Sequence, residues 1–156
     1  MNRSDARCRF GSVPLRERAN GVAESDAAVT DTHALLFHAA GNPRLGKKAA
    51  AHFDRAEERR AIVYVPAAVM WEVALLSRGA RVNLRQTPRD FFADLFTNPA
   101  YQPYDLTPAQ IFDADDLRIN RDPFDALICA AARDLQLPLI TRDTEIGGSG
   151  AVRVIW

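Results

Sequence analysis

The chain has 156 residues, of which 47% are apolar and 26% are charged, a composition typical of one folded domain and unlike that of disordered or fibrous chains. Twenty basic residues balance twenty acidic ones, so the net charge excludes a general basic surface, and any contact with nucleic acid must be local. No apolar run reaches the roughly 18 to 20 residues of a membrane span, and the N-terminus lacks the apolar segment of a signal peptide.

The predicted strands alternate with helical patterns from residue 27 to residue 156, whereas residues 1–26 show little periodicity. We expect residues 1–26 to be a flexible extension or a misassigned start, and residues 27–156 to form one α/β domain with a parallel sheet covered on both faces. Pro103 favours an edge position for the third strand. The strands are predicted at residues 27–30, 61–65, 101–106, 137–141 and 152–156.

Helices are predicted between these strands. Thr87, Thr107 and Asp122 each precede a proline, and this pairing of an N-cap residue with a proline at the first helical position marks three helix starts. Gly79 ends the helix that follows the second strand. The remaining helices are predicted at residues 32–39, 45–56 and 67–77.

Two cysteines are too few for a disulfide framework. Cys129 lies in an apolar helical stretch, where a free thiol packs well, and Cys8 lies in the extension. We therefore expect a protein of the reducing cytoplasm.

Four acidic residues from distant parts of the chain are candidates for one site. In a parallel α/β sheet, ligands bind beyond the carboxyl ends of the strands, and polar residues that closely follow the predicted strands should gather there. These candidates are Asp31, Glu72, Asp125 and Asp143.

Each of these acids also has a structural alternative. Glu72 lies on the apolar stripe of its helix, where a carboxylate must be paired or bound to a metal, unless it reaches water at the edge of the stripe. Asp125, near the start of its helix, favours the helix dipole. Asp31 and Asp122 could cap helices, and Asp143 could form an Asx-turn.

Several carboxylates brought together repel one another, and a divalent cation removes that conflict. Oxygen ligands without a Cys or His cluster favour Mg²⁺ or Mn²⁺ over Zn²⁺. Such ions activate water and stabilise a leaving oxygen, which suits phosphodiester hydrolysis. His33, His38 and His52 lack the spacing of a zinc pair, and we expect them to be solvated or to pack.

A basic stretch without acids follows Glu72. Its arginines are three, four and four residues apart, and it could hold phosphates next to the scissile one. The alternative is a solvated connection between helices. The arginines are Arg78, Arg81, Arg85 and Arg89, of which the first three are the candidates for binding the phosphates of a nucleic acid.

The ordered set of these segments resembles the PIN-domain ribonucleases, and among them the VapC-like toxins of bacterial type II toxin–antitoxin pairs. The resemblance covers residues 27–156, and the order and spacing of its segments are more specific than any one segment. The segments are VTDTHALL at 29–36, MWEVA at 70–74, RDPFDALI at 121–128, LITRD at 139–143 and VRVIW at 152–156.

The resemblance implies a three-layer α/β/α sandwich with strand order 3-2-1-4-5 and an endoribonuclease that depends on Mg²⁺ or Mn²⁺. It carries catalytic and metal-site roles to Asp31, Glu72, Asp125 and Asp143, and supporting roles to two hydroxyls. Asp122 either caps its helix or completes the acidic ring. The two hydroxyls belong to Thr32 and Thr141.

The same resemblance implies three partners: an RNA substrate, a VapB-like antitoxin that silences the enzyme, and a second copy in a homodimer. DNA would be reached only through the antitoxin. The alternative is a catalytically silent PIN-like module that binds a metal or a partner. A receiver domain and a haloacid-dehalogenase-like phosphatase are disfavoured, because Asp31 is followed by Thr32 and His33 and the expected acid and lysine positions are missing.

Overall fold

The computed structural model describes residues 26–156. The predicted extension, apart from Asp26, and Cys8 lie outside the described residues. Five strands form one parallel sheet in the order β3-β2-β1-β4-β5, which confirms the predicted 3-2-1-4-5 order. The strands are β1 (Ala27–Thr30), β2 (Ile62–Pro66), β3 (Tyr101–Tyr104), β4 (Leu139–Ile140) and β5 (Val154–Ile155).

Strand β1 lies at the centre of the sheet. It pairs with β2 through Ala28 and Val63 and with β4 through Val29 and Leu139. All four side chains are fully buried, as expected for a parallel sheet that is covered on both faces. The topology therefore places the carboxyl ends of β1 and β4 side by side, at the point where the strand order reverses.

Strand β4 is shorter than the predicted 137–141. The Leu137 N–H donates to the Ala132 carbonyl at 3.0 Å and so completes the end of the preceding helix instead of joining the sheet. Pro138, which has no N–H to donate, then separates that helix end from the strand. β3 lies at the edge and contains Pro103, as predicted.

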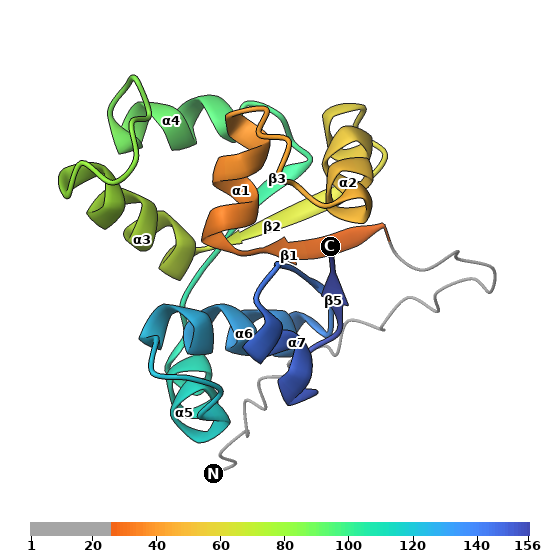
Figure 1. Ribbon diagram of the computed structural model, residues 1–156, viewed down its shortest axis with the longest axis vertical. Helices are drawn as coiled ribbons and strands as arrows, with labels where there is room; N and C mark the ends of the chain where they lie inside the picture. The colour runs from red at the N-terminus through yellow and green to blue at the C-terminus, as the bar shows by residue number, and fades with distance from the viewer. Residues whose placement is uncertain (1–25) are drawn as a thin grey trace, which may run out of the picture.

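The helices form two layers, with α1 to α4 on one face of the sheet and α5 to α7 on the other (Figure 1). α3 also contacts α6 near one edge of the sheet. The helices are α1 (Thr32–Ala39), α2 (Lys47–Glu57), α3 (Ala67–Arg78), α4 (Pro88–Leu95), α5 (Pro108–Leu117), α6 (Pro123–Leu135) and α7 (Thr144–Ser149). Among the described residues, no helix is long and apolar enough to span a membrane.

The predicted helix starts are confirmed. Thr87 Oγ1 accepts from the Asp90 N–H at 3.1 Å, Thr107 Oγ1 accepts from the Gln110 N–H at 3.3 Å, and a proline follows each threonine. The short helix α7 was not predicted, because Gly147 lies inside it and glycine is a poor helix former.

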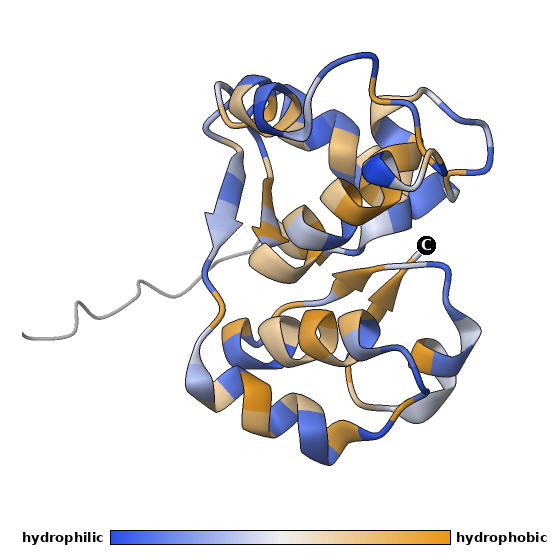
Figure 2. Ribbon diagram, turned by 90° about the vertical axis from the view of Figure 1, so that its left-hand side faces the viewer, coloured by the Kyte–Doolittle hydropathy of each residue, from blue (hydrophilic) through white to orange (hydrophobic). Residues whose placement is uncertain are grey.

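The core consists of the sheet and the apolar helix faces packed against it, and the hydrophobic strands lie between the two helical layers (Figure 2). The apolar face of α2 is buried, since Ala49, Phe53 and Ala56 are fully inaccessible. His52 is also buried, with Nε2 3.2 Å from the Ile62 carbonyl oxygen, so it packs as expected. On α5, Ile111 is 49% exposed, whereas Leu117 packs against the core.

Gly46, which precedes α2, packs closely against Trp156. A Cβ at Gly46 would lie 2.5 Å from the Trp156 carbonyl carbon, whereas a Cβ at Gly147 would meet nothing within 4 Å. We expect Gly46→Ala to lower the free energy of unfolding by about 1–3 kcal/mol through overpacking. The matched control, Gly147→Ala, should leave it unchanged or raise it by up to about 1 kcal/mol. Urea unfolding of both variants measures the difference, and equal stability would contradict the close packing of Trp156.

Candidate active site

Asp31 follows β1 directly and caps α1. Its Oδ1 accepts from the Ala34 N–H at 2.6 Å, and the residue is only 7% exposed. Burial raises the pKa of Asp31 above its ordinary value, and hydrogen bonds from Thr141 and from the Ala34 N–H partly offset that rise. The same carboxylate therefore caps α1 and lies just beyond the end of β1.

Glu72 lies on α3, beside the start of α1. The Thr32 hydroxyl donates a hydrogen bond to Glu72 Oε2. Glu72 is partly exposed, whereas Val69 and Val73 on the same helix are fully buried. The carboxylate therefore lies at the edge of the stripe, as in one of the alternatives considered for it, and its charge acts on Asp31. Thr32, to which the resemblance gives a supporting role, thus contacts one of the four candidate acids.

Asp125 lies in the first turn of α6 and is half-buried. Asn120 Nδ2 donates to Asp125 Oδ2 at 2.7 Å. Burial raises the pKa of Asp125 to about 6, the Asn120 hydrogen bond opposes that rise, and the nearby negative charges add to it. These charges belong to Asp122, Asp143 and Glu72.

Asp122 caps α6, which is one of the two roles considered for it. Its Oδ1 accepts from the Phe124 N–H at 2.9 Å, and its own N–H donates to Asn120 Oδ1 at 2.9 Å. Asn120 therefore bridges the two aspartates at the start of α6, since its amide group bonds to Asp125 as well. Asp122 contributes a negative charge near Asp125.

Asp143 lies beyond β4 and caps α7. Its Oδ1 accepts from the N–H groups of Glu145 and Ile146 at 2.7 and 2.9 Å. The Asp143 N–H donates to Thr141 Oγ1 at 3.1 Å. Because Thr141 also bonds to Asp31, its buried hydroxyl links the acids that follow β1 and β4.

The four carboxylates interact through their charges. Glu72 acts on both Asp31 and Asp125, and Asp143 acts on Asp125. Burial raises the pKa of the Cys129 thiol to about 12, and negative charges contribute to that rise. Three of the four acids supply them: Asp125, Asp143 and Asp31.

The donor chemistry of this site fits a hard divalent cation. The carboxylate oxygens are of the type that Mg²⁺ and Mn²⁺ prefer, and the raised pKa values of Asp31 and Asp125 reflect buried, crowded negative charge that a cation would relieve. Within residues 26–156, no three His, Cys, Asp or Glu side chains already stand in a group able to hold a metal ion. The acids therefore lie near one another without forming a closed ligand set.

A groove of about 740 Å³ lies beside these acids, between α3 and the start of α6. Glu72 and Asp122 contribute acidic groups to it, and Arg81 and Arg121 contribute basic groups. The apolar part of the lining comes from Leu75, Leu76, Pro123 and Phe124.

The predicted RNA-binding arginines divide into different environments. Arg81 lines this groove, but Arg85 lines a separate hollow between the end of α1 and residues 82–91. The Arg78 guanidinium lies 4.9 Å from the centre of the exposed Trp71 ring. The three arginines lie in different surroundings because the chain leaves the helix at Gly79 and turns at Ala80 and Arg85, both with positive φ. Their RNA-binding role stays a prediction.

Sequence reasoning missed two polar residues of the site. Asn120 holds Asp122 and Asp125, and Arg121 lines the groove. Both precede the Asp122–Pro123 helix start, and their position next to two candidate acids was the only signal in the sequence.

The family model for the PIN domain matches residues 28–147. The chain belongs to the PIN-domain family. All four carboxylates of the site lie inside the matched part of this PIN domain. In sequence, the chain matches no curated protein significantly.

Solved structures share the fold of this PIN domain at low sequence identity. VapBC2 from Rickettsia felis, bound to a promoter DNA fragment, aligns with TM-score 0.61 and 13% identity over 83% of this chain and 98% of the other. FitAcB from Neisseria gonorrhoeae aligns with TM-score 0.57 and 18% identity over 83% of this chain and 96% of the other. VapC20 from Mycobacterium tuberculosis, a toxin that cleaves the sarcin-ricin loop, aligns with TM-score 0.57 and 19% identity over 81% of this chain and 98% of the other. The alignments span nearly the whole of each neighbouring chain.

Proposed function

We propose that this PIN domain is an endoribonuclease toxin that depends on Mg²⁺ or Mn²⁺. The proposal is supported by charge interactions among four carboxylates from distant parts of the chain, two of which lie just beyond β1 and β4. The structural neighbours support it, since they include VapC-type toxins and one that cleaves RNA. The four acids are Asp31, Glu72, Asp125 and Asp143.

The residues of the proposed site have different roles. Asp31, Glu72, Asp125 and Asp143 would hold the cation, which when bound activates water and stabilises the leaving oxygen of a phosphodiester. The Thr32 hydroxyl orients Glu72 through its hydrogen bond. The caps made by Asp31 and Asp143 each use Oδ1, so neither cap occupies Oδ2. Thr141 also bonds to the Asp31 carboxylate.

Cleavage of a structured RNA by the full chain tests the proposal. We expect cleavage in Mg²⁺ or Mn²⁺ and none after chelation with EDTA, because removal of the cation removes the activated water. Restoration by added Mn²⁺ controls for damage by the chelator. Cleavage that persists in EDTA would contradict the proposed metal dependence.

We further propose a VapB-like antitoxin as the protein partner, with DNA reached only through that antitoxin, and a homodimer as the assembly. VapBC2 and another VapBC complex were solved with DNA, and a further neighbour is a toxin–antitoxin complex from Klebsiella pneumoniae. We expect a short protein encoded next to this chain to co-purify with it and to suppress cleavage. Binding of promoter DNA by the chain alone would contradict the proposed route to DNA.

A silent PIN-like module is the second candidate, because the acids of the described chain do not form a closed metal-holding group. Isothermal titration with Mn²⁺ separates the two functions when it is read beside the cleavage assay. Metal binding without cleavage of any tested RNA favours the silent module, whereas metal-dependent cleavage rules it out.

A further inference from the structure

We propose that Asn120 is a positioning residue of the metal site: its amide keeps the Asp125 carboxylate from turning back to cap α6 and so holds it available for the cation. This inference rests on the proposed function and names a residue on which the affinity for metal depends. Asn120 lies in the connection between α5 and α6 and is not one of the four acids.

Two hydrogen bonds fix the Asn120 amide in one orientation. Its Nδ2 donates to Asp125 Oδ2 at 2.7 Å, and its Oδ1 accepts from the Asp122 N–H at 2.9 Å. An ionised carboxylate only accepts and a backbone N–H only donates, so exchanging the nitrogen and the oxygen of the amide would break both bonds. Asn120 therefore meets Asp125 with an N–H donor.

Asp125 has a competing use at the start of α6. Asp122 is the N-cap of that helix, and Asp125 is the third residue after it. In a capping box, the acidic side chain at this third position reaches back and accepts from the N–H of the N-cap residue. Here the Asp122 N–H already donates to Asn120. The Asp125 carboxylate is therefore left out of the cap.

The connection between the two helices holds Asn120 at this point. Arg118 ends α5 in a left-handed conformation, and the next residue, Ile119, packs against the hydrophobic core. Asn120 follows at once and is only partly exposed. The anchored turn therefore fixes where the Asn120 side chain meets the start of α6.

Two acids of the site accept a hydrogen bond from a neutral side chain. Thr32 donates to Glu72, and Asn120 donates to Asp125. Replacing a residue that orients a metal ligand in this way commonly weakens metal binding by about 10- to 100-fold. Unlike Thr32, Asn120 also occupies the N–H for which its acid would compete. Its loss should therefore redirect the Asp125 carboxylate as well as loosen it.

Isothermal titration of the full chain with Mn²⁺ tests the inference. Asn120→Ala leaves the Asp122 N–H for the Asp125 carboxylate, and we expect Mn²⁺ to bind at least about tenfold more weakly than to the wild type. Asn120→Ser keeps an acceptor for that N–H, because a serine hydroxyl forms the same kind of turn, and should lose less affinity than Asn120→Ala. Urea unfolding shows whether each variant is folded.

RNA cleavage at increasing Mn²⁺ concentrations gives a second readout. If only a fraction of the Asn120→Ala molecules present Asp125 to the cation, the apparent affinity falls by that fraction, and excess Mn²⁺ restores the population. Half-maximal cleavage should therefore need at least about tenfold more Mn²⁺, whereas the maximal rate should stay within about threefold of the wild type. A maximal rate as low as that of Asp125→Asn would overturn the positioning role.

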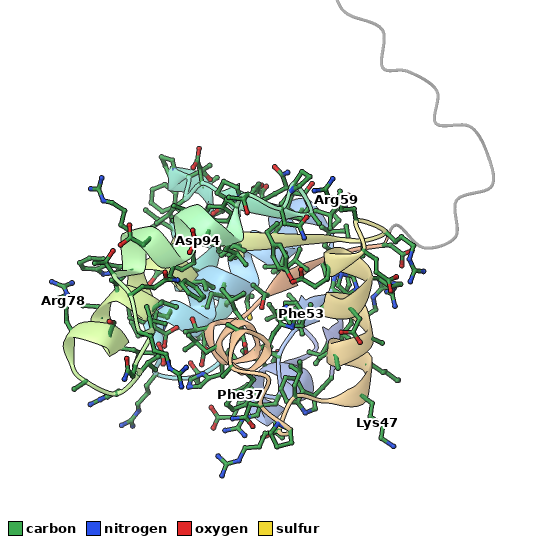
Figure 3. All side chains as sticks on the ribbon, turned by 90° about the horizontal axis from the view of Figure 1, so that it is seen from above. Phe37, Lys47, Phe53, Arg59, Arg78 and Asp94 are labelled. Atoms are coloured by element: carbon green, nitrogen blue, oxygen red, sulfur yellow. The ribbon has the colours of Figure 1, made fainter. Side chains whose placement is uncertain are left out.

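The matched control is Asn98→Ala. Asn98 makes the same pair of contacts elsewhere, since its Oδ1 accepts from the Ala100 N–H at 3.0 Å and its Nδ2 donates to Glu57 Oε2 at 3.4 Å. Glu57 ends α2, which begins at Lys47 and lies across the molecule from Arg78 at the end of α3 (Figure 3). Asn98→Ala should leave the affinity for Mn²⁺ unchanged.

The outcomes separate the inference from the proposed function. If the wild type and Asn120→Ala bind Mn²⁺ equally well, the inference is overturned and the proposed function stands. An equal loss in Asn120→Ser and Asn120→Ala, or in Asn98→Ala and Asn120→Ala, would also overturn it, because the effect would not depend on the Asp122 N–H or on the site. No binding of Mn²⁺ by the wild type would contradict the proposed metal dependence and the inference together.

Discussion

Asp125→Asn should abolish metal-dependent cleavage and, at the same time, stabilise the protein in the absence of metal. The expected loss of activity is at least about a hundredfold, because a neutral amide replaces a carboxylate that would hold the cation. The gain in stability follows from the crowded charge at this position. Burial and three neighbouring acids raise the pKa of Asp125 to about 6, so its ionised form is unfavourable in the folded, metal-free protein.

The sign of the pH effect follows from the same shift. Asp125 has its ordinary pKa of 3.8 when unfolded and about 6 when folded, so the folded state binds more protons between these values. Stability in EDTA should therefore fall as pH rises from about 4 to 6. With allowance for solvent screening of this half-buried group, the decrease is about 1–2 kcal/mol.

Urea unfolding in EDTA at several pH values measures this effect. Asp125→Asn should make the pH-dependent decrease smaller, because the amide does not titrate and can still accept a hydrogen bond from Asn120 through its oxygen. The raised pKa of Asp31 leaves a remainder. Asp134→Asn is the matched control: Asp134 bonds to Tyr104 and Gln110, and its pKa is lowered, so its loss should not stabilise the protein. An Asp125→Asn protein with wild-type activity in Mg²⁺ would remove Asp125 from the metal site.

The sequence was sufficient to predict most of the fold, because its signals are local and strong. The threonine–proline pairs at Thr87 and Thr107 determine helix starts through a side-chain cap and a proline that needs no N–H partner. The apolar runs of β1 and β2 match a sheet buried on both faces. The exceptions were short elements: α7 contains two glycines, and β4 has only two residues.

The candidate acids were also predictable, because the carboxyl ends of parallel strands meet at one edge of the sheet. The groups that position them were harder to predict. The role of Asn120 depends on the connection between α5 and α6, where Arg118 adopts a left-handed conformation. The surroundings of the arginines after Glu72 were likewise hard to predict, because the chain leaves α3 at Gly79 and no helical spacing applies beyond it.

Two substitutions of Asp31 should separate its cap of α1 from its proposed role in holding the cation. Asp31→Asn and Asp31→Ala should both reduce metal-dependent cleavage at least about a hundredfold, because neither supplies the negative charge that would hold the cation. Only Asp31→Ala removes the oxygen that accepts from the Ala34 N–H, which costs about 1 kcal/mol of stability for a lost helix cap. The amide oxygen of Asp31→Asn keeps that bond.

The comparison therefore separates catalysis from folding in one residue. Asp31→Asn should unfold in urea at the same concentration as the wild type or a higher one, since burial raises the pKa of Asp31 and the amide avoids the burial of a charge. Asp31→Ala should unfold at a lower concentration than Asp31→Asn. If both variants are inactive but equally stable, the cap contributes nothing measurable. If Asp31→Asn cleaves RNA as the wild type does, the charge at the end of β1 is not required, and the proposed metal site does not include Asp31.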